Sequence, residues 1–253
     1  MRFDDKLAIV TGADSGIGRA TATRMLSEGA QIVALDIAHT NPWPAGLGDQ
    51  VHIVTADLAD PATPELLHNA LEALSTPPGI LVNAAGVLRI APFWNVTPND
   101  WDHTIAVNLK SVFFLTQTVS RLMVDAGVAG RVVNVSSVHA VVSEPNAAPY
   151  TASKGGMEAM TRTIATELAP YGITVNCVRP GAIRTRMSEP IYTKAMLKAL
   201  SERIPSGTVA TPEWVANAIC YLASDESVYT TGACLDVDGG YAMNGALPGI
   251  ECE

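Results

Sequence analysis

The chain has 253 residues, of which 48% are hydrophobic, and its formal net charge is −9 at pH 7. This composition indicates a packed globular protein, and so acidic a chain is unsuited to the phosphate backbone of nucleic acids or to an anionic membrane. No apolar run approaches the roughly 20 residues of a membrane span. The first residues lead directly into an apolar strand without a secretory leader, and the four cysteines lack C-x-x-C spacing. We therefore expect a cytoplasmic protein with reduced cysteines.

The chain begins with a strand, a glycine-rich turn and a helix. Residues 7–10 form an apolar run typical of a buried strand, and residues 19–28 have helical spacing. Between them lies the turn T-G-A-D-S-G-I-G, whose glycines let the backbone approach a pyrophosphate in front of the free N–H groups of the helix. The candidate pyrophosphate-binding residues are Gly12, Asp14, Ser15, Gly16, Ile17 and Gly18.

A carboxylate ends the second predicted strand. Residues 31–35 are apolar and lead into Asp36, about 20 residues past the glycine turn, where an acid accepts both ribose hydroxyls of an adenosine and repels a 2′-phosphate. Ile37 follows, and the turn residues Asp14 and Ser15 add no cation. The pattern favours NAD over NADP, while a helix N-cap role for Asp36 stays open.

Small and polar residues end the next two strands. The elements predicted here are a loop or very short helix at 39–50, a strand at 51–56, a helix at 64–74 and a strand at 80–82. The third strand ends at Asp57 and Leu58, and the fourth leads into Asn83, Ala84, Ala85 and Gly86. Small residues at that point let the backbone pass close to a flat group such as a ribose, or form a tight turn.

The second half continues the alternation. The predicted elements are a helix at 97–126, a strand at 131–135, a helix at 150–171, a strand at 173–178, one or two mobile covering helices at 188–203, a helix at 212–223 and a strand at 232–237. Ser136 and Ser137 follow the fifth strand, at the edge that faces the ligand crevice of an open α/β sheet. The default interpretation of Asn108 is a structural one, in which its amide hydrogen-bonds the backbone. Alternating strands and helices indicate a single α/β domain, a parallel sheet with helices on both faces.

Tyr150 and Lys154 lie four residues apart, which places both side chains on one face of a helix. A free tyrosine has a pKa of about 10, and a nearby cation lowers that value by stabilising the phenolate. The pair is therefore a candidate acid–base unit for an alcohol proton. A chance pair on an amphipathic helix stays open at this point.

Together, in this order and spacing, these motifs resemble the short-chain dehydrogenase/reductase family, in its NAD-preferring subgroup, over about residues 7–240. The family's glycine motif T-G-x-x-x-G-x-G fits residues 11–18, its N-A-A-G motif fits 83–86 and its Y-x-x-x-K fits Tyr150 and Lys154. Its P-G-x-x-x-T motif fits Pro180, Gly181 and Thr185. The resemblance implies a single Rossmann-type, doubly wound domain of about seven parallel strands.

The resemblance also implies a mechanism, in which Tyr150 takes the proton of a secondary alcohol or returns it to the carbonyl. Lys154 lowers the tyrosine pKa and holds the nicotinamide ribose, Ser137 binds the substrate oxygen, and Asn108 holds a relay water. The implied catalytic residues are Asn108, Ser137, Tyr150 and Lys154. The implied NAD-binding residues beyond the glycine turn are Asp36, Ile37, Asp57, Leu58, Asn83, Ala84, Ala85, Gly86, Tyr150, Lys154, Pro180, Gly181, Ile183 and Thr185.

The expected substrate side is polar. It comprises the catalytic Ser137 and Tyr150 together with Arg89, His139, Glu144 and Asn146, and a substrate-covering segment at 187–210. Polar residues favour a sugar, a polyol or a cyclic diol, and local likenesses to aldose 1-dehydrogenases and to dihydro-dihydroxybenzoate dehydrogenases agree, although a solvated rim reads equally well. A 3-oxoacyl thioester reductase and a non-catalytic NAD-sensing regulator remain alternatives. The five histidines lack metal-ligand spacing, so no metal is expected.

Family likeness also suggests a homotetramer of a single-domain chain, residues 1–253. The helices predicted at 108–126 and 150–171 would pack across one interface and the last strand across another. The tail 243–253 would then reach a neighbouring subunit or cover the crevice. Apart from further copies of itself, the expected partner is a small-molecule alcohol or carbonyl.

Overall fold

Seven parallel strands form one sheet in the order β3-β2-β1-β4-β5-β6-β7. The computed structural model describes residues 1–244. The strands are β1 (Leu7–Thr11), β2 (Gln31–Asp36), β3 (Val51–Thr55), β4 (Pro78–Asn83), β5 (Arg131–Val135), β6 (Thr174–Pro180) and β7 (Cys234–Val237). The strand order reverses between β1 and β4, so a ligand crevice is expected at the carboxyl ends of these two strands. The predicted seven-stranded, doubly wound parallel sheet is confirmed.

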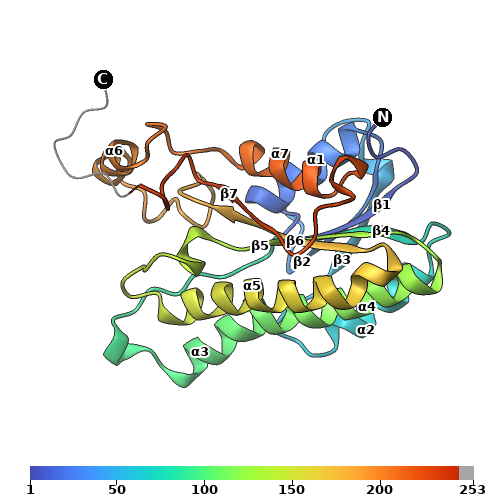
Figure 1. Cartoon of the computed structure of the whole chain (residues 1–253), viewed down its shortest axis with the longest axis horizontal. Coiled ribbons are helices and arrows are strands. Elements are labelled where there is room, and N and C mark those ends of the chain that lie inside the picture. The colour runs from blue at the N-terminus through green and yellow to red at the C-terminus, as the bar shows by residue number, and fades with distance from the viewer. Residues whose placement is uncertain (245–253) are drawn as a thin grey trace.

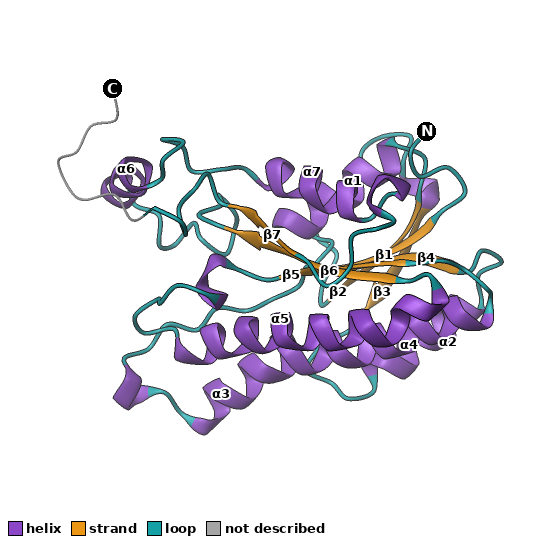
Figure 2. Ribbon diagram, viewed as in Figure 1, coloured by secondary structure: helices purple, strands orange, loops and turns teal. Residues whose placement is uncertain are grey.

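Helices cover both faces of the sheet (Figure 1). The helices α1 (Gly16–Ser27) and α7 (Pro212–Leu222) pack against each other on one face, and α2 (Thr63–Glu72), α4 (Ser111–Asp125) and α5 (Ala148–Leu168) cover the other. Two further helices, α3 (Pro98–Ile105) and α6 (Lys194–Arg203), project beyond the same end of the sheet, on opposite sides of it (Figure 2). None of the helices within residues 1–244 has the length and apolar character to cross a membrane.

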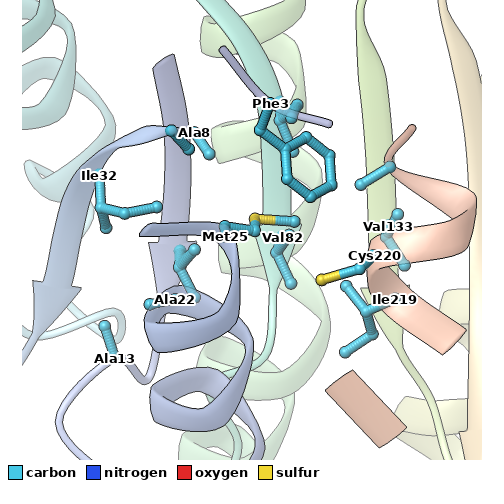
Figure 3. Close-up of a cluster of buried hydrophobic side chains, with 14 of the residues drawn as sticks. Phe3, Ala8, Ala13, Ala22, Met25, Ile32, Val82, Val133, Ile219 and Cys220 are labelled. Carbon is cyan, nitrogen blue, oxygen red and sulfur yellow. The ribbon is translucent and has the colours of Figure 1, made fainter. Parts of the chain in front are cut away.

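The core is split into two layers by the sheet. Because both faces are covered, strand residues are apolar in unbroken runs, and neighbours in the chain point into opposite layers. Val82 of β4 packs with Phe3, Met25 and Ile219 in the layer beneath α1 and α7 (Figure 3), whereas Leu81 packs into the layer beneath α4 and α5. The two filled layers hold the strand ends in fixed positions.

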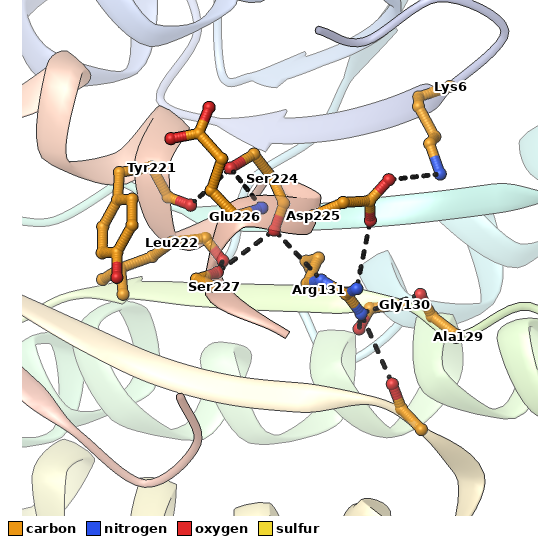
Figure 4. Close-up of polar contacts among 11 residues, drawn as sticks. Lys6, Ala129, Gly130, Arg131, Tyr221, Leu222, Ser224, Asp225, Glu226 and Ser227 are labelled. Atoms are coloured by element: carbon orange, nitrogen blue, oxygen red, sulfur yellow. Dashed lines mark hydrogen bonds and ion pairs between the residues drawn. The ribbon is translucent and has the colours of Figure 1, made fainter. Parts of the chain in front are cut away.

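A polar cluster closes the end of the sheet away from the crevice (Figure 4). The guanidinium of Arg131, at the start of β5, is buried and donates to the carboxylate of Asp225 at 3.1 Å and to the carbonyl of Ser224 at 3.4 Å. Lys6 lies 3.8 Å from the same carboxylate. These contacts tie the turn after α7 to β5, so the cluster has a structural role.

Several element bounds differ from the sequence predictions. The helix predicted at 97–126 is α3 and α4 joined by a π-helical turn at Ala106–Lys110, and α5 begins at Ala148 rather than Tyr150, since Pro149 fits a first helical turn. The loop 39–50 contains a short helix at Gly48–Gln50, as one alternative expected. Strand β7 begins at Cys234 rather than Gly232, and residues 188–191 are turns ahead of α6, which begins at Lys194. Most of the predicted tail, residues 245–253, lies outside the described residues.

Candidate functional site

A cavity of about 670 Å³ opens at the carboxyl ends of the strands, a volume typical of small-molecule and cofactor sites. Most of the residues singled out from the sequence line it. They are Gly12, Ser15, Gly16, Ile17, Asp36, Ile37, Asp57, Leu58, Ala84, Ala85, Gly86, Ser137, His139, Glu144, Tyr150, Lys154, Pro180, Gly181, Ile183 and Thr185. Six others do not line it, namely Asp14, Gly18, Asn83, Arg89, Asn108 and Asn146.

The glycine turn and the end of β4 meet in the floor of the cavity. Gly12 has a φ of +68°, and a Cβ there would lie 2.9 Å from the Cα of Ala85, so only glycine fits. The hydroxyl of Thr11 accepts hydrogen bonds from the N–H groups of Ala84 and Ala85, both at 3.0 Å. The two segments therefore present one continuous backbone surface that a flat ligand can approach.

Helix α1 points its amino terminus at the cavity. Ser15 is the N-cap residue, and Ser15, Gly16 and Ile17 all line the cavity wall. Free N–H groups and the helix dipole make this end a site for phosphate. Gly18 serves packing instead, because a Cβ there would lie 2.3 Å from the carbonyl oxygen of Gly12.

Asp36 lines the cavity at the end of β2, beside the glycine turn. Its Oδ2 accepts from the N–H of Asp14 at 2.9 Å and its Oδ1 from the N–H of Ile37 at 2.8 Å. These bonds fix the carboxylate while leaving lone pairs free for a diol such as a ribose. The side chain is half-buried and lines the cavity.

Asp14 turns away from the cavity, unlike the sequence expectation. Its carboxylate accepts from the backbone N–H groups of Thr40 and Asn41 at 3.0 and 2.9 Å, and from both of their side chains. Burial raises the pKa of Asp14, but these hydrogen bonds outweigh burial and leave it below its ordinary value. The residue anchors the proline-rich loop 39–50 to the glycine turn.

Tyr150, Lys154 and Ser137 converge on one wall of the cavity. Tyr150 lies in the first turn of α5, and the Lys154 ammonium is one turn on, 5.7 Å from the centre of the tyrosine ring. The ammonium donates to the carbonyl of Val135 at 2.7 Å, and Ser137 follows β5 two residues later. The Ser137 hydroxyl lies close enough to the Tyr150 phenol to lower the pKa of that phenol by hydrogen bonding. An oxygen next to Ser137 and Tyr150 would meet two hydroxyl groups at once.

Burial shifts the pKa values of Tyr150 and Lys154. It raises the pKa of Tyr150, which the hydrogen bond with Ser137 lowers only in part, and it lowers the pKa of Lys154 to about 8. The direction for Tyr150 differs from the sequence expectation, because the ammonium donates to Val135 and not to the phenol. Tyr150 is therefore a protonated phenol at neutral pH in this structure.

Asn108 is fully buried behind the cavity, in the π-helical turn. Its Oδ1 accepts from the N–H of Val87 at 2.8 Å, and its Nδ2 donates to the carbonyl of Val87 at 2.9 Å and to the hydroxyl of Ser153 at 3.2 Å. It thus pins the segment after β4 to α5, next to Lys154. A relay water at Asn108 stays a prediction.

Three other predicted residues lie away from the cavity. The side chain of Asn83 points into the core and donates to Asn134 at 2.8 Å. Arg89 is exposed and lies 4.0 Å from Asp100. Asn146 is exposed with a φ of +67°. Arg89 and Asn146 are therefore rim residues here, in line with the solvated alternative.

The outer wall includes residues that the sequence analysis did not single out. His103 of α3, Tyr241 after β7 and Arg186 line the cavity. Helical spacing or a motif marks none of them, because their place depends on how distant segments meet. Within the wall, His139 Nε2 lies 3.4 Å from a carboxylate oxygen of Glu144.

Known proteins resemble this chain in sequence and in fold over nearly all of its length. The family model described as enoyl-(acyl carrier protein) reductase matches residues 12–242. The 3-oxoacyl-acyl-carrier-protein reductase FabG of Thermotoga maritima is 41% identical, over 96% of this chain and 100% of that protein. The D-threitol dehydrogenase of Mycolicibacterium smegmatis is 37% identical, over 96% of this chain and 95% of that protein.

Solved structures agree with these relatives. A gluconate 5-dehydrogenase from Beutenbergia cavernae, described as putative and with bound NADP, has a TM-score of 0.90 at 32% identity, covering 96% of this chain and 100% of that one. A 4-hydroxyisoleucine dehydrogenase complexed with NADH has a TM-score of 0.89 at 30% identity, covering 94% and 99%. Because the family model matches residues 12–242 and these relatives cover 96% of the chain, the chain belongs to the short-chain dehydrogenase/reductase family of oxidoreductases.

Proposed function

We propose that the protein is an NAD(H)-dependent oxidoreductase that interconverts a secondary alcohol and its carbonyl, with Tyr150 as the acid or base. The observation that carries the proposal is that Ser137, Tyr150 and Lys154 line one cavity together with the glycine turn and Asp36. Proton-transfer groups and candidate dinucleotide-binding residues thus open into the same space. A non-catalytic regulator would have no use for the first of these features.

The chain's own residues divide the chemistry between them. A bound nicotinamide supplies the hydride acceptor or donor, and in its oxidised form a positive charge beside the phenol. Tyr150 removes the hydroxyl proton in oxidation and returns it to the carbonyl oxygen in reduction. Ser137 hydrogen-bonds the same oxygen, and Lys154 places a cation near the developing charge. Because burial keeps Tyr150 protonated at neutral pH, its resting state is ready to donate in reduction.

The residues along the cavity support a dinucleotide as the ligand. The amino terminus of α1 would bind the pyrophosphate, Asp36 the adenosine ribose, and Asp57 with Leu58 the adenine. Asp36 supports NAD over NADP, since its fixed carboxylate would repel a 2′-phosphate. The similar structures include both an NADP-bound and an NADH-bound protein, so this preference rests on Asp36.

A polyhydroxylated substrate is supported by the polar part of the outer wall. His139 and Glu144 face each other at 3.4 Å, and the buried Nδ1 of His139 has no hydrogen-bond partner within residues 1–244. Tyr192 lines the cavity as well. A sugar, polyol or cyclic diol would supply the hydroxyl groups that these side chains lack, and the D-threitol dehydrogenase among the relatives is consistent with a polyol.

A 3-oxoacyl thioester is the second candidate substrate. Apolar residues of the proposed covering segment, 187–210, line the cavity, namely Met187, Ile191, Met196 and Leu200. An acyl chain would find apolar contacts there. The reductase from Thermotoga maritima is the relative that supports this candidate.

The two candidates separate in one assay. Reduction of NAD is followed by absorbance with a panel of polyols, aldoses, cyclic diols and simple secondary alcohols, and oxidation of NADH and NADPH is followed with an acetoacetyl thioester. We expect turnover with NAD and a polyhydroxylated alcohol. Turnover with the thioester alone would favour the second candidate.

Tyr150→Phe is the control for the assay. It should lower kcat at least about a thousandfold and leave the NAD dissociation constant within about threefold, because only the proton-transfer group is lost. Comparable activity in that variant would contradict the proposed role of Tyr150. A protein that binds NAD and turns over neither the alcohols nor the thioester would favour a regulator.

A further inference from the structure

A cation lies over the glycine turn although the turn itself contains none. The guanidinium of Arg186 lies 3.4 Å from the hydroxyl of Ser15, the N-cap residue of α1. The two residues are 171 positions apart in the chain, and both line the cavity. Arg186 therefore brings a positive charge to the end of α1 that already attracts anions.

This guanidinium is available for a ligand. Among residues 1–244, its one hydrogen bond is the long contact to Ser15, and its side chain is exposed to the cavity mouth. Its charge lowers the pKa of Asp14 slightly, but that carboxylate is already satisfied by Thr40 and Asn41. Four of the five N–H donors of Arg186 thus have no protein acceptor.

Arg19, the nearest cation of α1 itself, is already engaged elsewhere. Its guanidinium stacks on the ring of Trp43 at 3.6 Å and donates to the carbonyl of Pro42. It does not line the cavity. Among the lysines and arginines of residues 1–244, the cavity is lined only by Lys154 and Arg186, at different places along it.

The backbone before and after Arg186 is fixed by Ser188. The Ser188 hydroxyl accepts from the N–H of Thr185 at 2.9 Å and donates to the carbonyl of Ile183 at 2.8 Å. The N–H of Glu189 donates to the carbonyl of Thr185 at 3.0 Å. These hydrogen bonds hold the backbone of Arg186 near Gly16, which the methyl group of Thr185 also approaches.

We propose that Arg186 binds the pyrophosphate of the dinucleotide, so that a cofactor-binding cation directly precedes the covering segment. The inference rests on the proposed function and adds a residue to it. A guanidinium donates two parallel hydrogen bonds to a phosphate, and the N–H groups of α1 approach the same group from the other side. Arg186 also lies at the start of the segment that leads to α6, whose Met196 and Leu200 line the cavity. Cofactor binding would therefore tie this segment to the glycine turn.

Equilibrium binding of fragments tests the proposal without turnover. Calorimetry would measure ADP, adenosine, NAD and NADP binding to the wild type and to Arg186→Gln, Arg186→Lys and Arg184→Gln. Arg184 is the matched control, an exposed arginine two residues away that does not line the cavity. Thermal unfolding of each variant would check that the fold is intact.

We expect Arg186→Gln to weaken ADP, NAD and NADP about tenfold each, because all three share the pyrophosphate, and to leave adenosine unchanged. Arg186→Lys should retain most of the affinity, and Arg184→Gln all of it. Unchanged ADP binding in Arg186→Gln would overturn the inference while leaving the proposed function intact. A loss confined to NADP would overturn it too, by assigning the cation to the 2′-phosphate. A wild-type protein that binds none of the dinucleotides would overturn the proposed function itself.

Discussion

Tyr150 and Lys154 are one helical turn apart, and burial moves their proton affinities in opposite directions. A phenol becomes harder to ionise when buried, whereas a buried ammonium becomes easier to deprotonate. Both shifts favour the neutral side chains, but at neutral pH only the phenol is neutral, because a pKa of about 8 leaves most of the Lys154 side chains protonated. The ammonium is therefore the fixed charge beside the phenol, and burial strengthens its effect on a bound ligand.

Lys154 makes stability depend on pH. Its pKa is about 8 in the folded protein, against an ordinary value of 10.5, so the unfolded chain holds a proton that the folded chain has lost between these pH values. The free energy of unfolding should therefore rise with pH across that window, by at most about 1.4 kcal/mol per pH unit, and the penalty of burying the ammonium stays constant below pH 8.

The matched variant Lys154→Met lacks the titrating group and keeps a similar volume. Urea unfolding of both proteins at pH 7, 8, 9 and 10 should show the wild type gaining about 2 kcal/mol relative to Lys154→Met between pH 8 and 10. Other groups titrate equally in both proteins and cancel. Parallel curves for the two proteins would contradict a lowered pKa for Lys154.

Asp36 should control the choice between NAD and NADP. Its carboxylate also supports the glycine turn through the N–H of Asp14, so Asp36→Ala would remove a structural bond together with the charge. Asp36→Asn removes the charge and keeps an oxygen for the N–H of Asp14, at the loss of the bond from the N–H of Ile37. We expect Asp36→Asn to reduce the preference for NAD, measured as the dissociation constant of NADP divided by that of NAD, at least about tenfold, from lost repulsion of the 2′-phosphate and weaker ribose bonds.

Both Asp36 variants would be measured by direct titration with each dinucleotide. Asp36→Ala should relax the same preference but also weaken binding of both cofactors, since the turn loses its support. A ratio that stays the same in Asp36→Asn would show that the ribose acceptor is misassigned. Asp57→Asn is the comparison variant, because Asp57 also lines the cavity at a strand end and is assigned to the adenine.

At the scale of elements, hydrogen bonds connect α5 to the ends of two strands next to Tyr150, Lys154 and Ser137. Glu158 lies one turn beyond Lys154, and its buried carboxylate accepts from the hydroxyl of Ser136 at 2.8 Å. The same carboxylate accepts two hydrogen bonds from Arg179 of β6, both at 2.7 Å. Because Ser136 directly precedes Ser137, this network fixes the position of Ser137 relative to Tyr150 on α5.

Glu158→Gln should destabilise the protein by about 2–3 kcal/mol, because an amide cannot accept both bonds from Arg179 and leaves that half-buried cation with only its contact to Asp236 at 3.2 Å. Urea unfolding measures the loss, and kcat should fall with it if the network positions Tyr150. Glu167→Gln is the control on the exposed face of the same helix, where we expect a change within about 0.5 kcal/mol. Equal stability of the two variants would contradict a positioning role for Glu158.

What the sequence could predict depended on local patterns. Apolar runs such as residues 7–10 and the alternation of strands and helices predicted the sheet, because burial on both faces requires them. The glycine turn, Asp36 and the Tyr150–Lys154 pair were readable as short motifs. Contacts between distant segments left no such pattern. The carboxylate of Asp14 is bound by a loop that begins at residue 39, and Arg186 contacts Ser15, which is 171 positions away in the chain. Burial of Tyr150, which decides its pKa direction, is likewise a property of the assembled fold.

At the scale of the whole molecule, apolar side chains are exposed in two regions, one at the β7 edge of the sheet and one on α4. Strand β7 is an edge strand with Leu235 38% exposed, and Trp214 of α7 is 51% exposed beside it. On the opposite layer, Phe113 and Phe114 of α4 are 37% and 39% exposed. Unpaired strand edges and apolar helix faces of this kind are often covered by other chains. We therefore predict a homotetramer in which β7 and the α4–α5 layer form separate interfaces.

Light scattering tests this assembly, since four copies of a 26.6 kDa chain differ clearly in mass from two. Leu235→Lys places a charge in the proposed β7 interface and should convert the tetramer into a dimer that keeps the α4–α5 contact. Ile53→Lys is the matched control, because Ile53 is 55% exposed on β3, the other edge strand, where no interface is predicted. That variant should remain tetrameric. A monomeric wild type, or a tetramer that survives Leu235→Lys, would show that β7 does not join subunits.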